Sequence, residues 1–88
     1  MQIPDVEVFS AIAESGSLSA AARRLGLAPM TVSRRLASLE GELGVRLFHR
    51  TTRSVSLTAE GETFLPFATT LLEASEGARV SLKSNAGA

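Results

Sequence analysis

Cysteine is absent from this chain of 88 residues, and histidine occurs only once, at position 49. Without cysteine, a disulfide, a thiolate metal site and a cysteine nucleophile are all excluded, as is typical of proteins of the reducing cytoplasm. No apolar run approaches the roughly 18 residues that span a bilayer, and the N-terminus carries acids where a signal peptide carries bases. We therefore expect a cytoplasmic protein with no membrane partner.

Groups suited to catalysis are also scarce. The chain has no second histidine, no glycine-rich phosphate loop and no pair of carboxylates on a plausible pocket wall. Its acids lie near predicted helix starts or on the last predicted helix, where helix capping and solvation explain them. We expect His49 to be a packed or exposed imidazole rather than a ligand or a base. The sequence thus predicts no enzyme, no cofactor and no metal site.

The formal net charge is zero, but the charges are segregated along the chain. From Arg23 to Arg53 there are seven arginines and two glutamates, a local charge of +5, and the other residues carry −5. A phosphate backbone responds to charge within a Debye length of roughly 8–10 Å, so this local excess matters more than the total. Arginine, with its planar guanidinium, suits phosphate and guanine edges better than lysine does.

Apolar residues at spacings of three and four predict three helices, over about residues 4–15, 18–25 and 29–43. Ser17 is placed to cap the second helix, and Pro29 to open the third. A glycine follows each helix, where it can adopt the left-handed conformation that ends helices (Gly16, Gly26 and Gly44). The positions expected to face the core are Val6, Phe9, Ile12 and Ala13 in the first helix, and Val32, Leu36, Leu39 and Leu43 in the third.

The second and third helices have the residues that a helix–turn–helix requires. Its helices cross at about 90–120° over a short turn, so a small residue is needed at the crossing and a residue free to take positive φ in the turn. Ala22 and Gly26 meet these two needs. The apolar residues expected to hold both helices to the core are Leu18, Leu25, Leu27, Val32 and Leu36.

The apolar period changes after the third helix, because apolar and polar residues alternate over 45–57. This pattern predicts two short strands around the turn RTTRS, a hairpin that corresponds to the wing of winged-helix proteins. Thr58 then caps a long helix to about residue 82, in which Pro66 predicts a kink or an irregular turn. The end, KSNAGA, is expected to fray.

The expected fold is therefore mainly α, a winged helix–turn–helix with a three-helix core, a two-stranded β-hairpin wing and a long C-terminal linker helix. It divides the chain into a winged helix–turn–helix domain over residues 1–57 and a helix with a frayed tail over residues 58–88. The family resemblance given below implies that the first is a DNA-binding domain and the second a linker or dimerisation helix.

Several polar residues of the predicted helix–turn–helix and wing suit contact with DNA. Arg34 could donate two hydrogen bonds to guanine, and Met30 and Thr31 could pack against a thymine methyl group, although both could equally form an ordinary helix surface. Arg50 and Arg53, helped by the hydroxyls of Thr51 and Thr52, could reach phosphates. The other arginines, Arg23, Arg24 and Arg35, are more simply explained by solvation or by pairing with Glu40 or Glu42.

Four stretches, GSLSAAARRLG, VSRRLASLEGELGVRLF, RTTR and LTAEGE, resemble the N-terminal winged helix–turn–helix domain of LysR-type transcriptional regulators, over about residues 3–82. The resemblance implies sequence-specific binding of double-stranded DNA for transcriptional regulation, at the bacterial nucleoid. Helix 29–43 would enter the major groove, and wing 45–57 would contact the backbone or minor groove. The resemblance assigns base reading to Pro29, Met30, Thr31, Ser33 and Arg34, and phosphate contacts to Ser17, Ser19, Arg50, Thr51 and Arg53.

The last helix resembles the linker helix of this family, which pairs with its copy in a homodimer. The resemblance assigns dimerisation to Phe64, Leu65, Ala68, Leu71, Leu72 and Leu82. Full-length members continue into an effector-binding domain, so an effector ligand would bind outside this chain. One departure concerns Ala28-Pro29-Met30, which replaces a common Ser-Gln-Pro run and so removes a glutamine that often reads a base.

An alternative function is a winged-helix module for protein interaction and dimerisation, without specific DNA binding. The apolar stripe of the last helix fits both functions. The arginine-rich segment favours DNA binding, because a module that only docks proteins has little need of it.

Overall fold

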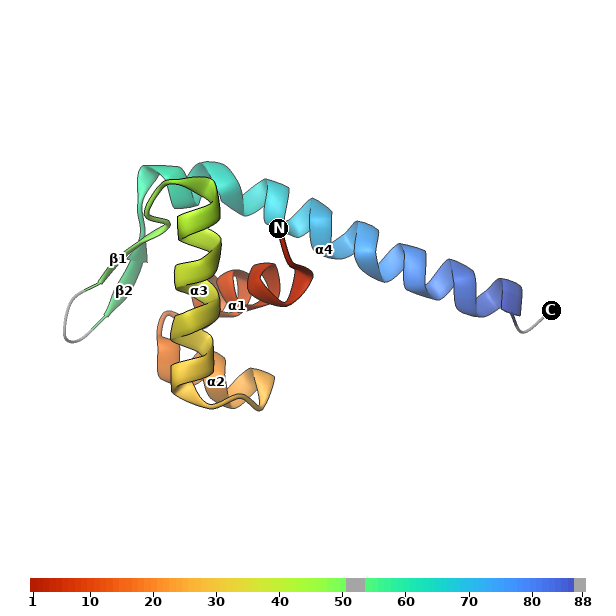
Figure 1. Ribbon diagram of the computed structural model, residues 1–88, viewed down its shortest axis with the longest axis horizontal. Coiled ribbons are helices and arrows are strands. Elements are labelled where there is room, and N and C mark those ends of the chain that lie inside the picture. The colour runs from red at the N-terminus through yellow and green to blue at the C-terminus, as the bar shows by residue number, and fades with distance from the viewer. Residues whose placement is uncertain (51–53, 87–88) are drawn as a thin grey trace.

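The computed structural model describes residues 1–50 and 54–86. The elements follow in the order α1 (Ile3–Ser15), α2 (Leu18–Leu25), α3 (Pro29–Leu43), β1 (Phe48–Arg50), β2 (Val55–Leu57) and α4 (Ala59–Ala86). In Figure 1 the first three helices form a bundle with the hairpin on one side, while α4 crosses one end and projects away on the opposite side. The molecule is elongated as a result, with extents of 51 × 26 × 19 Å. The predicted winged helix–turn–helix is confirmed.

The boundaries of α2 and α3 are set by the local signals that the sequence carries. The Ser17 hydroxyl oxygen accepts a hydrogen bond from the backbone N–H of Ala20 at 3.0 Å, as expected of an N-cap. Gly26 ends α2 with φ of 67°, a left-handed conformation that glycine adopts without steric cost. Pro29 lies in the first turn of α3, where its missing N–H has no intrahelical partner to lose.

The hydrophobic core is centred on α1, which packs against α2, α3 and α4. The fully buried ring of Phe9 lies 5.3 Å from that of Phe48 and 5.1 Å from that of Phe64, measured between centroids. The predicted core residues Val6, Phe9, Ile12, Val32, Leu36 and Leu39 are completely buried. Val8, Ala11 and Ala21 are buried as well, although the apolar spacing did not predict them.

The first half of α4 belongs to this core. Ala68 is completely buried, and Phe64, Leu65 and Leu72 are partly buried against the same cluster. Pro66 neither breaks the helix nor introduces an irregular turn, because it lies on an exposed side where water can reach the freed carbonyl group. The helix continues to Ala86, beyond the expected end near residue 82.

The wing is a two-stranded antiparallel sheet. Phe48 pairs with Leu57, His49 with Ser56 and Arg50 with Val55. Because side chains alternate along a strand, Phe48 and Arg50 lie on one face of β1 and His49 on the other. Phe48 is buried, so the face that carries Arg50 is the one turned toward the helices. In the described part of the chain, no helix is both long and apolar enough to cross a membrane.

Candidate nucleic-acid interface

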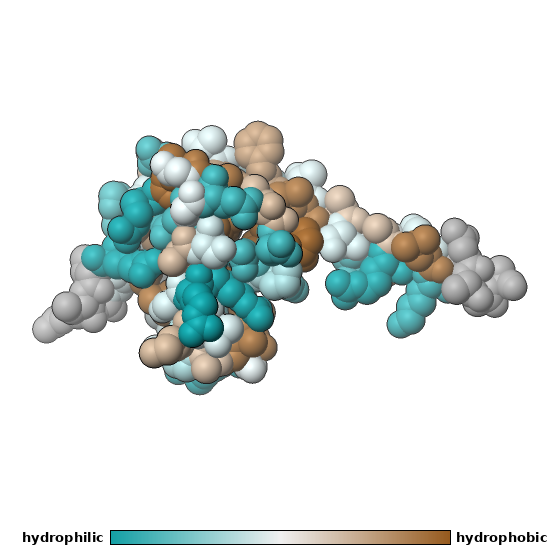
Figure 2. All heavy atoms as spheres, in the orientation of Figure 1, coloured by the Kyte–Doolittle hydropathy of each residue, from teal (hydrophilic) through white to brown (hydrophobic). Residues whose placement is uncertain are grey.

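Helix α3 presents a polar outward face opposite its buried stripe. Met30 is 71% exposed, and Pro29 and Arg34 are exposed as well, whereas Thr31 and Ser33 are half-buried. Hydrophilic side chains cover α3 and the neighbouring base of the wing in Figure 2. All five residues predicted to read bases therefore lie in the first half of one helix, and three of them are freely accessible.

The arginines of the basic segment differ in their partners. Arg24 donates a hydrogen bond from Nη1 to Oε2 of Glu14 at 3.0 Å, so its guanidinium already has a partner on the protein surface. In contrast, Arg23, Arg34 and Arg35 form no ion pair with any residue in the described part of the chain.

The acids proposed from sequence as partners of the surface arginines have other partners. Glu42 accepts the N-terminal ammonium group of Met1 at 2.7 Å. Glu40 pairs with Arg46 and Arg50. Of the two explanations offered for Arg23, Arg24 and Arg35, pairing with Glu40 or Glu42 is therefore wrong in the described part of the chain, and solvation is left for Arg23 and Arg35. The chain folds back after α3 and so brings Arg46 and Arg50 to Glu40. The spacing of residues within the helix does not predict these pairs.

The residues predicted to contact phosphates lie in two places. Ser17 and Ser19 flank the N-terminus of α2, where backbone N–H groups and the helix dipole favour an anion. Ser17 already uses its oxygen as the helix cap, and Ser19 is exposed. Arg50 lies at the end of β1. The predicted contacts Thr51, Thr52 and Arg53 fall outside the described residues. His49, which was expected to be either packed or exposed, is exposed.

A polar network that the sequence analysis missed joins α3, the wing and α4. The buried carboxylate of Glu40 accepts a hydrogen bond from the backbone N–H of Leu47 at 2.7 Å. The backbone carbonyl of Leu47 in turn accepts the N–H of Thr58 at 3.0 Å. The Thr58 hydroxyl donates to the carbonyl of Arg46 at 2.6 Å and accepts the N–H of Gly61 at 2.9 Å. The start of the wing is thus clamped between two helices.

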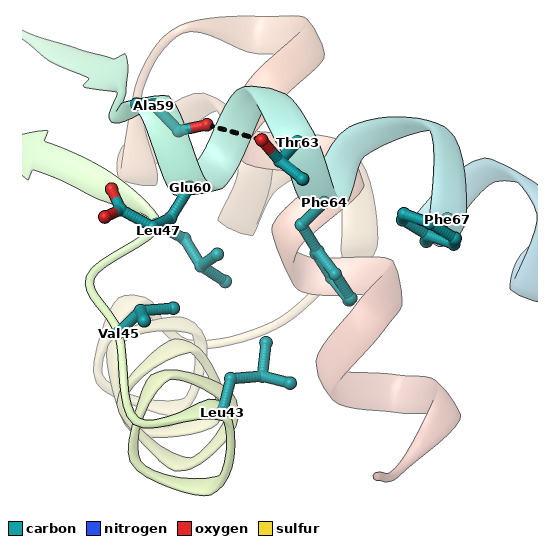
Figure 3. Close-up of a pocket in the computed structure, with 8 residues that line it drawn as sticks. All are labelled: Leu43, Val45, Leu47, Ala59, Glu60, Thr63, Phe64 and Phe67. Atoms are coloured by element: carbon teal, nitrogen blue, oxygen red, sulfur yellow. Dashed lines mark hydrogen bonds between the residues drawn. The ribbon is translucent and has the colours of Figure 1, made fainter.

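A second surface feature lies between the start of the wing and α4. Figure 3 shows Leu43, Val45 and Leu47 pointing into an open hollow that Phe64 borders from α4. The hollow has a volume of about 410 Å³, and Phe67 continues its rim. Phe67 is 63% exposed, and Leu71, Val80 and Leu82 are exposed further along the helix.

The three-helix core, the wing and the accessible face of α3 define a winged helix–turn–helix DNA-binding domain. The family described as “Bacterial regulatory helix-turn-helix protein, lysR family” matches residues 3–62, and the chain belongs to this family.

Individual relatives agree with this assignment. The HTH-type transcriptional regulator ClcR of Pseudomonas putida is 46% identical over 80 residues, which cover 91% of this chain and 27% of ClcR. The chain spans roughly a quarter of the length of such curated relatives. Among solved structures, a complex of the CbnR DNA-binding domain with DNA has a TM-score of 0.90 at 35% identity, covering 98% of this chain and 99% of that one. A complex of the BenM DNA-binding domain with catB site 1 DNA has a TM-score of 0.92 at 33% identity, covering 100% and 99%.

Proposed function

We propose that this chain binds double-stranded DNA in a sequence-specific manner and serves as the DNA-binding part of a transcriptional regulator. The observation that carries the proposal is the outward face of α3, where Arg34 is exposed and has no ion pair among the described residues. Two further arginines, Arg46 and Arg50, lie in the first half of the wing. The CbnR and BenM structures are complexes with DNA, and ClcR is named as a transcriptional regulator, which supports binding rather than catalysis.

Residues of α3 are proposed to read the bases in the major groove. The Arg34 guanidinium can donate two hydrogen bonds to O6 and N7 of guanine, a contact worth roughly 1–3 kcal/mol of discrimination. Met30 and the methyl group of Thr31 can pack against a thymine methyl, while Pro29 and Ser33 complete the surface that approaches the base edges. Phosphate contacts are proposed for Ser17, Ser19, Arg50, Thr51 and Arg53.

The chain is also proposed to form a homodimer through α4. Of the six residues predicted for this role, Leu71 and Leu82 are exposed, whereas Phe64, Leu65, Ala68 and Leu72 pack wholly or partly against the chain's own core. The exposed apolar surface extends to Phe67. We propose that a second copy of α4 covers this surface in a symmetric dimer. Such a dimer would hold two DNA-binding domains, and so two half-sites, at a fixed separation.

Salt-dependent binding to duplex DNA tests the proposal. In fluorescence anisotropy, the logarithm of the association constant should fall by about 0.9 per logarithmic unit of salt for each phosphate neutralised. Selection from a random duplex pool should give a defined site, and Arg34→Ala should relax the preference at one base pair of it. A chain that shows no duplex binding at any ionic strength, or no enriched site, contradicts the proposal.

A further inference from the structure

One carboxylate of α3 contacts the wing and has no role in the function proposed above. Glu40 is only 7% exposed, although it is a charged residue near the C-terminal end of α3. Its Oε2 accepts the Leu47 N–H at 2.7 Å, and its Oε1 accepts a hydrogen bond from Nη2 of Arg50 at 3.3 Å. A buried charge is costly unless it is paired and hydrogen-bonded, so these contacts are specific features of the fold.

Arg46 and Arg50 are unequal partners of this carboxylate. The Arg50 side chain is 32% exposed and hydrogen-bonded to Glu40, whereas the Arg46 side chain is 66% exposed and its Nε lies 3.6 Å from Oε2. A contact at 3.6 Å is too long for a hydrogen bond. Glu40 therefore hydrogen-bonds Arg50 and forms a longer ion pair with Arg46, which stays largely in solvent, so Arg46 serves as a control for Arg50.

Strand alternation turns Arg50 toward α3. Arg50 shares a face of β1 with the buried Phe48, and among the described residues its guanidinium donates one hydrogen bond, from Nη2 to Glu40. The guanidinium has five N–H donors in all, so several are left to bind a phosphate. A DNA backbone that passes from the groove occupied by α3 to the wing would meet this group.

We propose that Glu40 is a positioning residue for DNA binding, which holds the guanidinium of Arg50 between α3 and the wing so that it meets a backbone phosphate. Glu40 does not touch the DNA. The inference rests on the proposed function, since it concerns the strength of that same binding. Its physical basis is preorganisation: an arginine side chain that is already held loses less conformational freedom when the phosphate binds.

The negative charge of Glu40 has a second effect on DNA binding, which opposes the preorganisation of Arg50. A carboxylate near DNA repels phosphate, so its removal alone would strengthen binding, most of all at low salt. At about 0.15 M salt the Debye length is about 8 Å, which weakens this long-range repulsion. The loss of a local hydrogen bond to Arg50 is screened much less. We therefore expect the positioning effect to be larger at that ionic strength.

A double-mutant cycle between Glu40 and Arg50 tests the proposal. Glu40→Gln keeps a side-chain oxygen that can accept the Leu47 N–H but removes the charge that holds Arg50. Binding to the selected duplex is measured at 0.15 M salt for the unaltered chain, Glu40→Gln, Arg50→Ala and the double variant. Glu40→Gln should weaken binding about 3- to 10-fold when Arg50 is present and less than about 2-fold when it is alanine, because the ordering cost falls on that side chain.

The same cycle with Arg46→Ala is the control. The effect of Glu40→Gln should persist when Arg46 is alanine, since Arg46 is not fixed by the carboxylate. An equal loss in the Arg50→Ala background would show that Glu40 acts only on the general fold and would overturn the proposal. Tighter binding by Glu40→Gln would overturn it as well.

A measurement on the unaltered chain keeps the proposal testable if Glu40→Gln does not fold. Nitrogen-15 relaxation of the arginine Nε–H groups should show Arg50 to be rigid in the absence of DNA and Arg46 to be mobile. Equal mobility of the two side chains would overturn the proposal. If the unaltered chain does not bind duplex DNA, the proposed function fails. If it binds but Arg50→Ala has no effect, this inference fails together with the phosphate contact proposed for Arg50, while the proposed DNA binding stands.

Discussion

The ring of Phe64 in α4 lies edge-on to the ring of Phe9 in α1, with centroids 5.1 Å apart and ring planes at 70°. The contact places the start of the predicted linker helix within the hydrophobic core of the DNA-binding domain. Phe67, less than one turn further along α4, is 63% exposed. Helix α4 therefore has two roles. Phe64 packs into the hydrophobic core, and Phe67 belongs to an exposed apolar face.

Phe64→Ala should destabilise the folded chain, whereas Phe67→Ala should not. Removing a partly buried ring that contacts Phe9 is expected to lower the free energy of unfolding by about 2–4 kcal/mol. Replacing the exposed Phe67 should change it by less than about 0.5 kcal/mol. Urea denaturation, at protein concentrations low enough for the monomer to predominate, measures both values.

For dimerisation, the exposed Phe67 is expected to be the important residue. Phe67→Ala should raise the dimer dissociation constant about 10-fold in sedimentation equilibrium, as expected for loss of a large aromatic contact. A variant that dissociates no more readily than the unaltered chain would show that this face of α4 is not the interface.

Local signals in the sequence were sufficient to predict most of the fold. Ser17 acts through its side-chain hydroxyl, and Gly26 and Pro29 act through their backbone geometry. All three signals are local, so the positions of α2 and α3 follow from short stretches of sequence. The division of α4 into two faces did not follow, because every apolar residue in its stripe looked equally suited to a partner. Only the packing of Ala68 and Phe64 against α1 separates them.

The site was predicted less completely than the fold. The outward face of α3 follows from helical periodicity, and the structure confirms that Arg34 is exposed. The role of Glu40 depends on Leu47 and Arg50, which reach it only after the chain reverses beyond α3. No local pattern distinguishes such a buried glutamate from a solvated one.

Gly61→Ala should destabilise the chain although alanine favours helices. A Cβ at Gly61 would collide with the backbone carbonyl oxygen of Leu47 and lie 2.9 Å from Cδ2 of Leu57. Relieving the overlap requires backbone movement at the start of the wing, which is expected to cost about 1–3 kcal/mol beyond the gain of about 1 kcal/mol in helix propensity. Thermal unfolding measures the net loss.

Gly77→Ala is the matched control in the same helix. Apart from its chain neighbours and the backbone of its own helix, no heavy atom of the described residues lies within 4 Å of a Cβ at Gly77, so only the helix propensity changes. This variant should be more stable by about 0.5–1 kcal/mol. If Gly61→Ala were stabilised to the same degree, the close approach of α4 to Leu47 would be refuted.

Substitutions at Ser17 separate its capping role from its proposed phosphate contact. Ser17→Ala removes the acceptor for the Ala20 N–H and should cost about 1 kcal/mol of stability. Ser17→Asp restores a good cap and complements the helix dipole, so it should unfold like the unaltered chain. If a phosphate lies at this helix start, the added negative charge should weaken DNA binding about 10-fold through repulsion. Unchanged affinity of Ser17→Asp in anisotropy titrations would place the phosphate elsewhere.

Thr58→Val should destabilise the chain because it removes a buried hydroxyl that serves two backbone groups. Thr58 is 5% exposed, donates to the carbonyl of Arg46 and accepts the N–H of Gly61. Valine has nearly the same shape but leaves both groups without this partner, at an expected cost of about 2–4 kcal/mol in urea denaturation. Thr63→Val is the control, because the Thr63 hydroxyl bonds to the carbonyl of Ala59 on an exposed part of the same helix, and its loss should cost less than about 0.5 kcal/mol.

Thr58→Ser distinguishes the hydrogen bonds from packing at the same position. Serine keeps the hydroxyl and loses only the methyl group, so it should recover all but about 1 kcal/mol of the stability lost in Thr58→Val. Equal destabilisation by serine and valine would mean that the methyl group, not the hydroxyl, holds the wing to α4. Since the same hydroxyl links the carbonyl of Arg46 to the first turn of α4, recovery by serine would identify it as the joint between the wing and the helix proposed to dimerise.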